Sequence, residues 1–509
     1  MCGIVAVLFP TIPKPIFENH LNKGKHRGPD NTQICYASDD VWLGFHRLAI
    51  NGLDDASNQP FYMDGIFLIC NGEIYNYKDL FYKLQITPTT HSDCEIIIHL
   101  YKQFGIDYVV HAIDASEFSF VLYDTNTQTI HVARDPYGVR PLYKGHTKHM
   151  LYFASELKMM PPLDSVEQFP PGTIMTITKD TTVMKKYCSL PSISKHQISH
   201  DHVYQSLYTA VKKRVLNTER PIACLLSGGL DSSIVASLVR QVMTDYNIVV
   251  PLETYSIGLP GAEDLKYADI MAHYLSSKHT SVILSEKDFL DAIPEVIYAI
   301  ESRDTTTVRA SVGNYLVCKY IKEHSDAKII FNGDGADEVC GGYLYMKNAP
   351  NMFEFDKECR RLVNDIHLFD AQRSDRSIST HGLESRTPFL DRSFVELYMS
   401  IPPVHRFTLC EKQFLRESFV GNLPDAILWR KKEAFSDGVS SMSKSWFTII
   451  QESIQDDTST GLVKEKKYYK QIYDSYFQHD LLPYFWMPKY TNTTDCSART
   501  LETYFTQNR

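Results

Sequence analysis

A glycine-rich turn near the middle of the chain constrains the fold more than any other feature. The apolar run Ile222–Leu226 leads directly into the sequence SGGLDSS at Ser227–Ser233, and a helix is expected to begin near Ser232. An apolar strand, a short turn and a helix in this order are typical of a parallel sheet covered by helices. Glycines let backbone N–H groups close around an anion at the start of a helix, where the helix dipole also favours negative charge. The turn therefore predicts an α/β domain that binds phosphate.

This turn differs from the common phosphate-binding loops. The glycines are not followed by Gly-Lys-Ser/Thr, so the sequence is not a Walker loop, and it does not have the glycine pattern of a dinucleotide fingerprint either. Asp231 stands inside the turn, and a Mg²⁺ ion between this carboxylate and the phosphate would explain it. The alternative is a plain strand–helix turn, which needs neither two adjacent glycines nor three hydroxyl groups and an acid.

A second acidic loop, Asn332–Glu338, follows the apolar run Ile329–Phe331. It does not fit a calcium loop, because Ala336 and Asp337 stand where that loop needs an acid and then a glycine. A solvated acidic loop is the alternative. Loops at the carboxyl ends of parallel strands face a common crevice. We therefore expect Asp231 and Asp337 to share one metal ion.

The first 160 residues carry a different pattern, of short alternating or apolar runs separated by turn residues, which is typical of β-strands. The clearest runs are Val41–Phe45, Ile66–Ile69, Phe118–Tyr123 and Thr129–Val132, and the dipeptide Asn71-Gly72 predicts a turn after the second of them. The chain thus combines a β-rich first half with an α/β second half.

A change in composition separates the two halves. Residues 189–202 are rich in Ser, Pro, His and Lys and have no apolar period, so we interpret them as a linker between domains at 2–188 and 203–509. An amphipathic helix opens the second domain: Val203, Leu207, Val211 and Val215 share one face, opposite Lys212, Lys213 and Arg214.

The second residue of the chain is a cysteine followed by an apolar run. If the initiator methionine is removed, Cys2 carries both a thiol and a free α-amine. Their ordinary pKa values are about 8.5 and about 8, so one group can relay the proton of the other without a histidine. This is the arrangement of an N-terminal nucleophile. The alternative is that Cys2 merely begins a strand.

Composition excludes several classes of protein. Hydrophobic residues at 43% and charged residues at 22% are typical of globular proteins, and a net charge of −9 offers no basic stripe for nucleic acid. We find no secretory signal and no run of about 20 apolar residues that could span a membrane. We therefore expect a cytoplasmic protein with no nucleic-acid or membrane partner. The 11 cysteines include no C-x-x-C pair, which disfavours a zinc site or a disulfide framework.

Several motifs resemble known families. Ser227–Ser233 resembles the pyrophosphate loop of ATP pyrophosphatases. With the acidic loop, further segments are similar to the synthetase domain of glutamine-hydrolysing asparagine synthetases: Glu301–Ala310, Gly382–Asp391, Trp429–Gly438, Phe485–Tyr490 and Ser497–Thr500. Cys2, Arg27–Asp30 and Arg134–Tyr143 resemble class II glutamine amidotransferases. The likeness runs essentially from end to end.

The resemblance implies a fold and a reaction. The fold is an N-terminal-nucleophile hydrolase sandwich, with two antiparallel sheets between helices, followed by a parallel-sheet α/β ATP-pyrophosphatase domain. The reaction is that of an ATP-dependent carbon–nitrogen ligase with glutamine as amido donor. L-Aspartate, L-glutamine, ATP and water give L-asparagine, L-glutamate, AMP and diphosphate through a β-aspartyl-AMP intermediate. Ammonia is channelled from the glutaminase site, Mg²⁺ is the cofactor, and a second copy of the chain is a candidate partner.

The resemblance also assigns residues to the synthetase site. Asp334 occupies the position tied to β-aspartyl-AMP formation, where many members have glutamate, and Lys432 is placed against the α-phosphate. Asp304 and Arg309 fall in the stretch that shapes the aspartate pocket, and Asp231 and Asp337 would hold the metal. The remaining ATP- and pyrophosphate-binding residues come from both loops and a neighbouring strand: Leu226, Ser227, Gly228, Gly229, Ser232, Ile257, Asn332 and Gly333.

The first half offers a residue for each task of a glutaminase. Arg47 can fork onto the α-carboxylate of glutamine, and Asp93 can accept from its α-ammonium group. The Asn71 amide and the Gly72 N–H can serve as oxyanion donors to the intermediate formed on Cys2. With these, the resemblance places the following residues at the glutamine site: Leu48, Ala49, Ile50, Asn51 and Glu73.

Three other functions are alternatives to a glutamine-hydrolysing asparagine synthetase. Relatives that adenylate another carboxylate, such as β-lactam-forming synthetases, lack the nucleophile that Cys2 supplies. Other class II amidotransferases share the first half of the chain but not the Ser227–Ser233 turn. An inactive interaction or storage protein on the same folds would not need the complete set of site residues found here.

Overall fold

The computed structural model describes residues 1–456 and 458–505 and divides into two compact units. Unit 1 comprises Met1–Ser189 with the short segments Asn217–Arg220 and Ser379–Glu384. Unit 2 comprises Leu190–Leu216, Pro221–Ile378 and Ser385–Arg509. Among the helices described, none has both the length and the hydropathy that a membrane span requires.

Unit 1 contains two six-stranded sheets whose paired strands are antiparallel. The first sheet has the strand order β10 (Ser165–Gln168), β8 (Tyr143–His146), β9 (Leu151–Ala154), β1 (Gly3–Leu8), β3 (Val41–Arg47) and β2 (Asn31–Ser38). The second has the order β12 (Thr182–Lys186), β11 (Thr173–Ile177), β7 (Thr129–Arg134), β6 (Phe118–Asp124), β5 (Ile66–Gly72) and β4 (Phe61–Met63).

The core of unit 1 lies between these sheets, where side chains from alternate positions of β1 meet the second sheet. Ile4 and Ala6 of β1 form one buried cluster with Ile69 of β5, Val121 of β6 and Val132 of β7. This packing fixes the start of β1 relative to the end of β5. Cys2 directly precedes β1 and Asn71 is near the end of β5, so the sandwich brings these two residues together.

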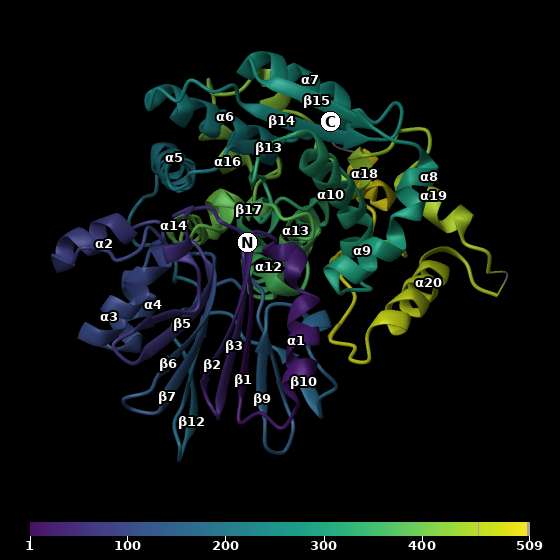
Figure 1. Ribbon diagram of the computed structural model, residues 1–509. Helices are drawn as coiled ribbons and strands as arrows, with labels where there is room; N and C mark the ends of the chain where they lie inside the picture. The colour runs from purple at the N-terminus through teal and green to yellow at the C-terminus, as the bar shows by residue number, and fades with distance from the viewer. Residues whose placement is uncertain (457, 506–509) are drawn as a thin grey trace. The chain divides into compact units, whose positions relative to one another are not determined.

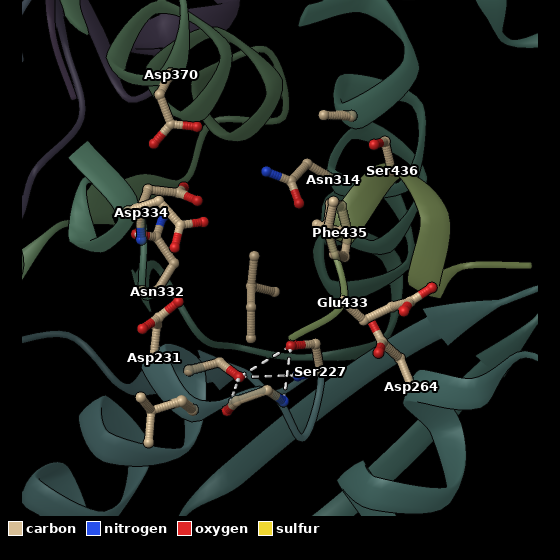
Figure 2. Close-up of a pocket in the computed structure, with 18 of the residues that line it drawn as sticks. Ser227, Asp231, Asp264, Asn314, Asn332, Asp334, Asp370, Glu433, Phe435 and Ser436 are labelled. Carbon is tan, nitrogen blue, oxygen red and sulfur yellow. Dashed lines mark hydrogen bonds between the residues drawn. The ribbon is translucent and has the colours of Figure 1, made fainter. Parts of the chain in front are cut away.

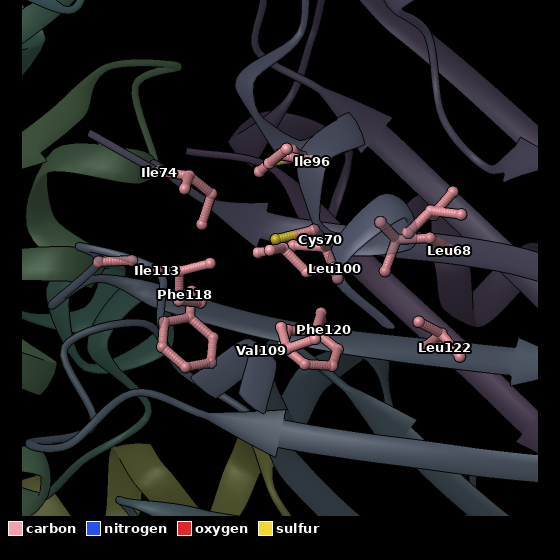
Figure 3. Packing of buried hydrophobic residues seen from close by; sticks show 14 of the residues in the cluster. Leu68, Cys70, Ile74, Ile96, Leu100, Val109, Ile113, Phe118, Phe120 and Leu122 are labelled. Carbon is pink, nitrogen blue, oxygen red and sulfur yellow. The ribbon is translucent and has the colours of Figure 1, made fainter. Parts of the chain in front are cut away.

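Helices cover the outer faces of the sandwich. The second sheet packs against α2 (Tyr77–Leu84), α3 (Ile96–Phe104) and α4 (Ile106–Ala112) through a second apolar cluster that includes Cys70, Ile96, Val109 and Phe120 (Figure 3). On the first sheet, Phe17 of α1 (Lys14–Asn22) lies edge-on to Trp42 of β3, with ring centroids 5.8 Å apart. The expected arrangement of two antiparallel sheets between helices is confirmed.

The strands expected in the first half are present, but the turn expected at Asn71-Gly72 is not. Both residues belong to β5 and pair with Ser119 and Phe118 of β6. The sequence signal for a hairpin turn was wrong because β5 continues through Asn71 to Gly72 and stays paired with β6 instead of reversing the chain.

Unit 2 is built on one five-stranded sheet with the order β15 (Lys278–Ile283), β14 (Glu253–Gly258), β13 (Ile222–Leu225), β16 (Ile329–Phe331) and β17 (Glu384–Arg386). The pairs β15–β14, β14–β13 and β13–β16 are parallel. Figure 1 shows helices packed around this sheet. The predicted parallel α/β domain is therefore confirmed.

The longer helices of unit 2 precede, connect or follow its strands: α5 (His200–Leu216), α6 (Leu230–Asp245), α7 (Glu263–Leu275), α9 (Ile293–Ile300), α10 (Thr305–His324), α12 (Met352–Asp365), α13 (Asp370–Ser379), α14 (Arg392–Met399), α19 (Trp446–Ser453) and α20 (Gly461–Tyr476). Shorter helices complete the unit: α8 (Glu286–Asp291), α11 (Ala336–Cys340), α15 (Pro403–Arg406), α16 (Gln413–Glu417), α17 (Asp425–Leu428), α18 (Phe435–Gly438) and α21 (Glu502–Phe505).

Helix α5 confirms the predicted amphipathic helix, since Val203, Leu207, Val211 and Val215 are buried. Arg214, expected on the solvent face, is an exception. Its side chain is fully buried, and its Nη1 donates to Asp391 Oδ2 at 2.7 Å. Apolar residues spaced by four along a helix cannot reveal a buried arginine whose partner lies far along the chain.

Candidate functional sites

The candidate nucleophile of unit 1 sits at the entry to β1. The Cys2 backbone N–H donates to Asn71 Oδ1 at 2.9 Å, and Cys2 Sγ lies 3.8 Å from the Leu48 carbonyl oxygen. Arg27 Nε donates to the Cys2 carbonyl at 2.9 Å. These contacts hold Cys2 between the start of β1, the end of β5 and the segment after β3.

The Asn71 side chain is oriented so that its amide group remains available. Its Oδ1 accepts from Cys2, while its Nδ2 is buried and has no hydrogen-bond partner among the described residues. A buried donor without a partner costs free energy, so such a group is usually kept for a ligand. Nδ2 is therefore well suited to donate to an oxyanion formed at Cys2.

Met1 changes the electrostatics of the nucleophile. Its amino group donates to Glu384 Oε2 at 3.2 Å, and the residue is almost fully buried. Burial raises the pKa of the Cys2 thiol to about 11, and the nearby amino group and the Leu48 hydrogen bond only partly oppose this effect. In the chain that retains Met1, Cys2 is thus a neutral thiol at physiological pH.

Arg47 and Asp93, the residues expected to bind the head group of glutamine, have fixed positions in unit 1. Arg47 is buried, and its guanidinium donates to Asn58 Oδ1 and to the Asp54 carbonyl, both at 2.8 Å, and to the Asn51 and Gly52 carbonyls. These contacts give Arg47 a fixed position. Asp93 Oδ2 accepts from the Ile74 N–H at 2.6 Å, which places this carboxylate just beyond the end of β5.

The remaining predicted glutamine-site residues are buried in the same region. Asn51 Nδ2 donates to Glu73 Oε2 at 2.9 Å, joining the segment after β3 to the segment after β5. The Ala49 N–H donates to Asp30 Oδ2 at 2.8 Å, and the Ile50 carbonyl accepts from Glu219. Hydrogen bonds thus hold the segment Leu48–Asn51, and the Leu48 carbonyl of this segment lies next to Cys2 Sγ.

The glycine-rich turn of unit 2 connects β13 to α6, as predicted. Ser227 Oγ lies 3.0 Å from Ser232 Oγ and accepts from the Gly229 N–H at 3.2 Å. Figure 2 shows these bonds closing the turn beneath the cavity. Gly228 has φ +68°, and a Cβ there would lie 2.3 Å from the Tyr267 carbonyl carbon, so no larger residue fits.

One cavity brings the two predicted loops of unit 2 together. Residues from the carboxyl ends of β13, β14 and β16 line it: Leu226, Ser227, Gly229, Asp231, Ser232, Ile257, Asn332, Gly333, Asp334 and Asp337. In Figure 2, Asp231, Asn332 and Asp334 lie on one side of the cavity, and Glu433 and Phe435 lie on the other. Gly228, although expected at the site, supports the turn from behind.

Two lysines join the acidic residues that were expected to share a metal. Lys412 Nζ lies 2.6 Å from Asp231 Oδ1 and also contacts Asp337 Oδ1. Lys432 Nζ lies 2.7 Å from Asp337 Oδ2 and 3.6 Å from Asp231 Oδ2. Burial disfavours ionisation of Asp337, but the two ammonium groups outweigh it and hold the pKa of this carboxyl below its ordinary value.

The carboxylate pair has the chemistry of a divalent-cation site. Its oxygens converge within ion-pair distance of a single ammonium group, and carboxylate oxygens are the ligands that Mg²⁺ prefers. Within residues 1–456 and 458–505, no group of three or more His, Cys, Asp or Glu side chains is placed to hold a metal. Two carboxylates fit Mg²⁺ when the phosphates of a nucleotide supply further ligands.

Asp334 faces the cavity beside a buried arginine. Arg373 Nη2 lies 2.6 Å from Asp334 Oδ1 and 2.5 Å from Asp370 Oδ1. Burial raises the pKa of Asp334 in spite of Arg373. Arg373 and Asp370 also line the cavity, so this side offers a cation between two carboxylates.

Asp304 and Arg309, which the resemblance places in the aspartate pocket, are not among the described residues that line the cavity. Asp304 caps α10 by accepting from the Thr307 N–H at 2.9 Å, and it also accepts from the Trp486 N–H. The Arg309 guanidinium pairs with Glu465 and Asp495. The helical period explains the difference, because Thr306, Thr307 and Ala310 of the same helix do face the cavity.

Sequence patterns missed Lys412, Arg373 and Asp370. Each stands far along the chain from the loop that it contacts, in a segment with no distinctive motif. Nothing in the sequence around Lys412 indicates that it is buried between two acids, since a lysine outside any motif is normally expected at the surface.

Comparisons with known proteins match two families to separate parts of the chain. Residues 1–168 match the family described as a glutamine amidotransferase domain, and residues 202–354 and 349–486 match the asparagine synthase family. Proteins named asparagine synthetase (glutamine-hydrolyzing) align with 99% of this chain over 99% of their own length. Their identity to it is 38% in Bos taurus, 37% in Homo sapiens and 36% in Gallus gallus.

Proposed function

We propose a complete reaction for this chain, which belongs to the family of glutamine-hydrolysing asparagine synthetases. It converts L-aspartate, L-glutamine, ATP and water into L-asparagine, L-glutamate, AMP and diphosphate. The observation that carries the proposal is the coexistence of a cysteine–amide site in unit 1 and a nucleotide-type cavity in unit 2, in a chain that matches its relatives over 99% of its length.

In unit 1, glutamine is hydrolysed through a thioester. Cys2 Sγ attacks the side-chain carbonyl carbon of glutamine, and Asn71 Nδ2 with the Gly72 N–H stabilises the oxyanion, each donor contributing about 3 kcal/mol. The C–N bond then breaks, and the thiol proton leaves with ammonia. Water hydrolyses the thioester to glutamate and restores the thiol. Arg47 and Asp93 hold the α-carboxylate and the α-ammonium group of the substrate.

In unit 2, ATP activates the substrate carboxylate. A β-carboxylate oxygen of aspartate attacks the α-phosphorus of ATP, diphosphate leaves, and β-aspartyl-AMP is formed. Ammonia attacks the acyl carbon, and AMP leaves as asparagine forms. The Ser227–Ser232 turn at the N-terminus of α6 suits the diphosphate. Lys432 offsets the negative charge that develops at the α-phosphate.

The proposed cofactor is Mg²⁺, held by Asp231 and Asp337 together with the phosphates of ATP. When bound, the ion would neutralise charge on the diphosphate leaving group. Lys412 and Lys432 contact both carboxylates and hold the pKa of Asp337 below its ordinary value, so the chain's own residues prepare this position.

Ammonia connects the two half-reactions. Because it becomes protonated in water and is then no longer a nucleophile, we propose that it passes from the first site to the second without release. Excess ¹⁵N-ammonium added to a glutamine-driven reaction at low turnover would then leave asparagine largely unlabelled. Labelling in proportion to the added ammonium would contradict transfer without release.

The direct test of the proposed function is product analysis. The protein is incubated with ATP, aspartate, Mg²⁺ and either glutamine or ammonium, and asparagine and nucleotides are quantified. We expect one AMP for each asparagine with either nitrogen source. ADP in place of AMP would rule out adenylation, and a lack of asparagine would favour an inactive interaction or storage protein.

A further inference from the structure

The loop that carries Lys432 has little structure of its own. It connects α17 to α18, and the intervening residues Trp429–Ala434 form no helix or strand. We call this segment the Lys432 loop. Arg430, Lys431, Lys432, Glu433 and Ala434 all line the nucleotide-type cavity. A catalytic group on such a loop needs contacts from elsewhere to hold it in place.

A segment near the end of the described chain supplies these contacts. Ser497–Tyr504, which we call the tail clamp, contains a 3₁₀ turn at Ala498–Thr500 and the start of α21. Its residues are not among those described that line the cavity. Ser497–Thr500 is one of the segments that resemble the synthetase family, but its residues, all within the described chain, do not line the cavity. Direct contact with the nucleotide therefore does not explain this motif.

The tail clamp holds the Lys432 loop through Glu433. Arg499 Nε donates to Glu433 Oε1 at 2.6 Å, and the Tyr504 hydroxyl donates to Glu433 Oε2 at 2.8 Å. Both carboxylate oxygens of the residue next to Lys432 are thus bound. Lys431 Nζ lies 3.8 Å from the centre of the Tyr504 ring, so both neighbours of Lys432 contact the clamp.

The clamp also fixes the helix that ends this segment. Ser497 Oγ donates to Asp437 Oδ1 at 2.7 Å, and the Ala498 N–H donates to Asp437 Oδ2 at 3.0 Å. Arg499 Nη1 donates to the Ser441 carbonyl at 2.8 Å. Asp437, Ser497 and Tyr504 are at most 3% exposed, so water competes little for these bonds.

The position of Lys432 depends on these neighbours because the ion-pair partners of its side chain, among the residues that the structure describes, are Asp231 and Asp337. On binding ATP, the Lys432 ammonium must leave or share Asp337 and meet the α-phosphate, while the backbone of the loop stays in place. Charge-assisted hydrogen bonds to both oxygens of Glu433 oppose displacement of that backbone. A loop held in advance loses less entropy when the transition state forms.

We propose that Arg499 and Tyr504 are positioning residues for adenylation, acting through Glu433 to hold Lys432 at the α-phosphate. This inference rests on the proposed synthetase reaction for its kinetic consequence. Its structural part, that the clamp orders the Lys432 loop, does not depend on any activity. The two parts are therefore tested separately.

Amide hydrogen exchange tests the structural part. In the full chain with the double substitution Tyr504→Phe and Arg499→Gln, exchange over residues 430–436 should rise about tenfold or more, as expected on loss of hydrogen bonds to a charged group. Tyr490→Phe is a matched control, because this hydroxyl donates to the Glu354 carbonyl at 3.2 Å and not to the loop. Unchanged exchange over 430–436 in the double variant would overturn the clamp.

Kinetics test the consequence. Tyr504→Phe should lower kcat for AMP formation from aspartate and ATP about tenfold with KM for ATP little changed, while glutamine hydrolysis and Tm stay at the level of Tyr490→Phe. In a Lys432→Arg background, Tyr504→Phe should have little further effect on kcat, because the Lys432 ammonium that Tyr504 positions is already absent.

Additive effects of the two substitutions on kcat would show that Tyr504 does not act through Lys432. If the parent protein forms no AMP, the proposed function fails, and the exchange result still decides the clamp.

Discussion

Removal of Met1 should activate the Cys2 thiol, and the size of the change follows from its surroundings. With Met1 attached, Cys2 is an internal residue whose backbone N–H donates to Asn71 Oδ1 at 2.9 Å. After removal, a free amine occupies that position, next to the thiol of the same residue. The amine can then accept the thiol proton, and as an ammonium group it would stabilise the thiolate.

The expected magnitude can be worked from the pKa. Burial raises the pKa of the Cys2 thiol from 9.0 to about 11 in the chain that bears Met1. Since thiolate falls tenfold for each pH unit below the pKa, the raised pKa leaves about a hundredth of the thiolate of an ordinary cysteine at pH 8. Alkylation should therefore be about a hundredfold slower before Met1 is removed than for an unstructured thiol.

The assay is alkylation by iodoacetamide as a function of pH, with Cys2 followed by peptide mass spectrometry. The Met1-bearing form is made by expression with methionine aminopeptidase inhibited, and the processed form is the comparison. The rate for the Met1-bearing form should still be rising above pH 10, whereas the processed form should reach its plateau at lower pH. Identical profiles for the two forms, or a plateau near pH 8.5 with Met1 present, would refute the reasoning.

Three further predictions concern unit 2. Asp231→Asn and Asp337→Asn should each abolish asparagine synthesis from glutamine and from ammonium but leave glutamine hydrolysis; a normal rate at ordinary Mg²⁺ in either variant would contradict a shared metal. Lys432→Ala should slow AMP formation in single-turnover experiments far more than it weakens ATP binding, and Lys432→Arg should recover only part of the rate; a raised KM for ATP with an unchanged saturating rate would show a purely ground-state contact. Arg309→Ala should destabilise unit 2 by about 3–5 kcal/mol in thermal unfolding, because Glu465 and Asp495 lose their buried partner. Initial rates should show little change in KM for aspartate in the folded fraction. A large rise in that KM without loss of stability would instead support the predicted place of Arg309 in the aspartate pocket.

The sequence predicted the fold class well because its strongest signals are local. The strand, turn and helix around Ser227–Ser233 occupy consecutive residues, and the glycine at 228 is demanded by a positive φ and by the approach of Tyr267. The alternation of apolar and polar residues in the first half likewise predicted the strands, although it could not show which strands pair. The turn expected at Asn71-Gly72 is absent because a dipeptide typical of turns can also form the end of a paired strand.

Contacts between distant segments were beyond sequence reasoning. Lys412, Arg373 and the tail clamp meet the predicted loops only in the folded chain, so spacing along the sequence gives no sign of them. The contacts of Asp304 and Arg309 were also beyond sequence reasoning. Their stretch does border the cavity, but Asp304 caps α10 and the period of that helix directs Arg309 toward buried acidic partners, whereas their neighbours line the cavity.

The central claim is that two sites in one chain act in sequence, and Cys2→Ala tests it most directly. Asparagine and AMP are measured with this variant in the presence of ATP, aspartate and Mg²⁺, once with glutamine and once with ammonium. We expect no asparagine from glutamine and an undiminished rate from ammonium, because only the source of nitrogen is lost. Glutamine-driven synthesis at the parental rate, or the loss of ammonium-driven synthesis in a variant that remains folded, would contradict this account.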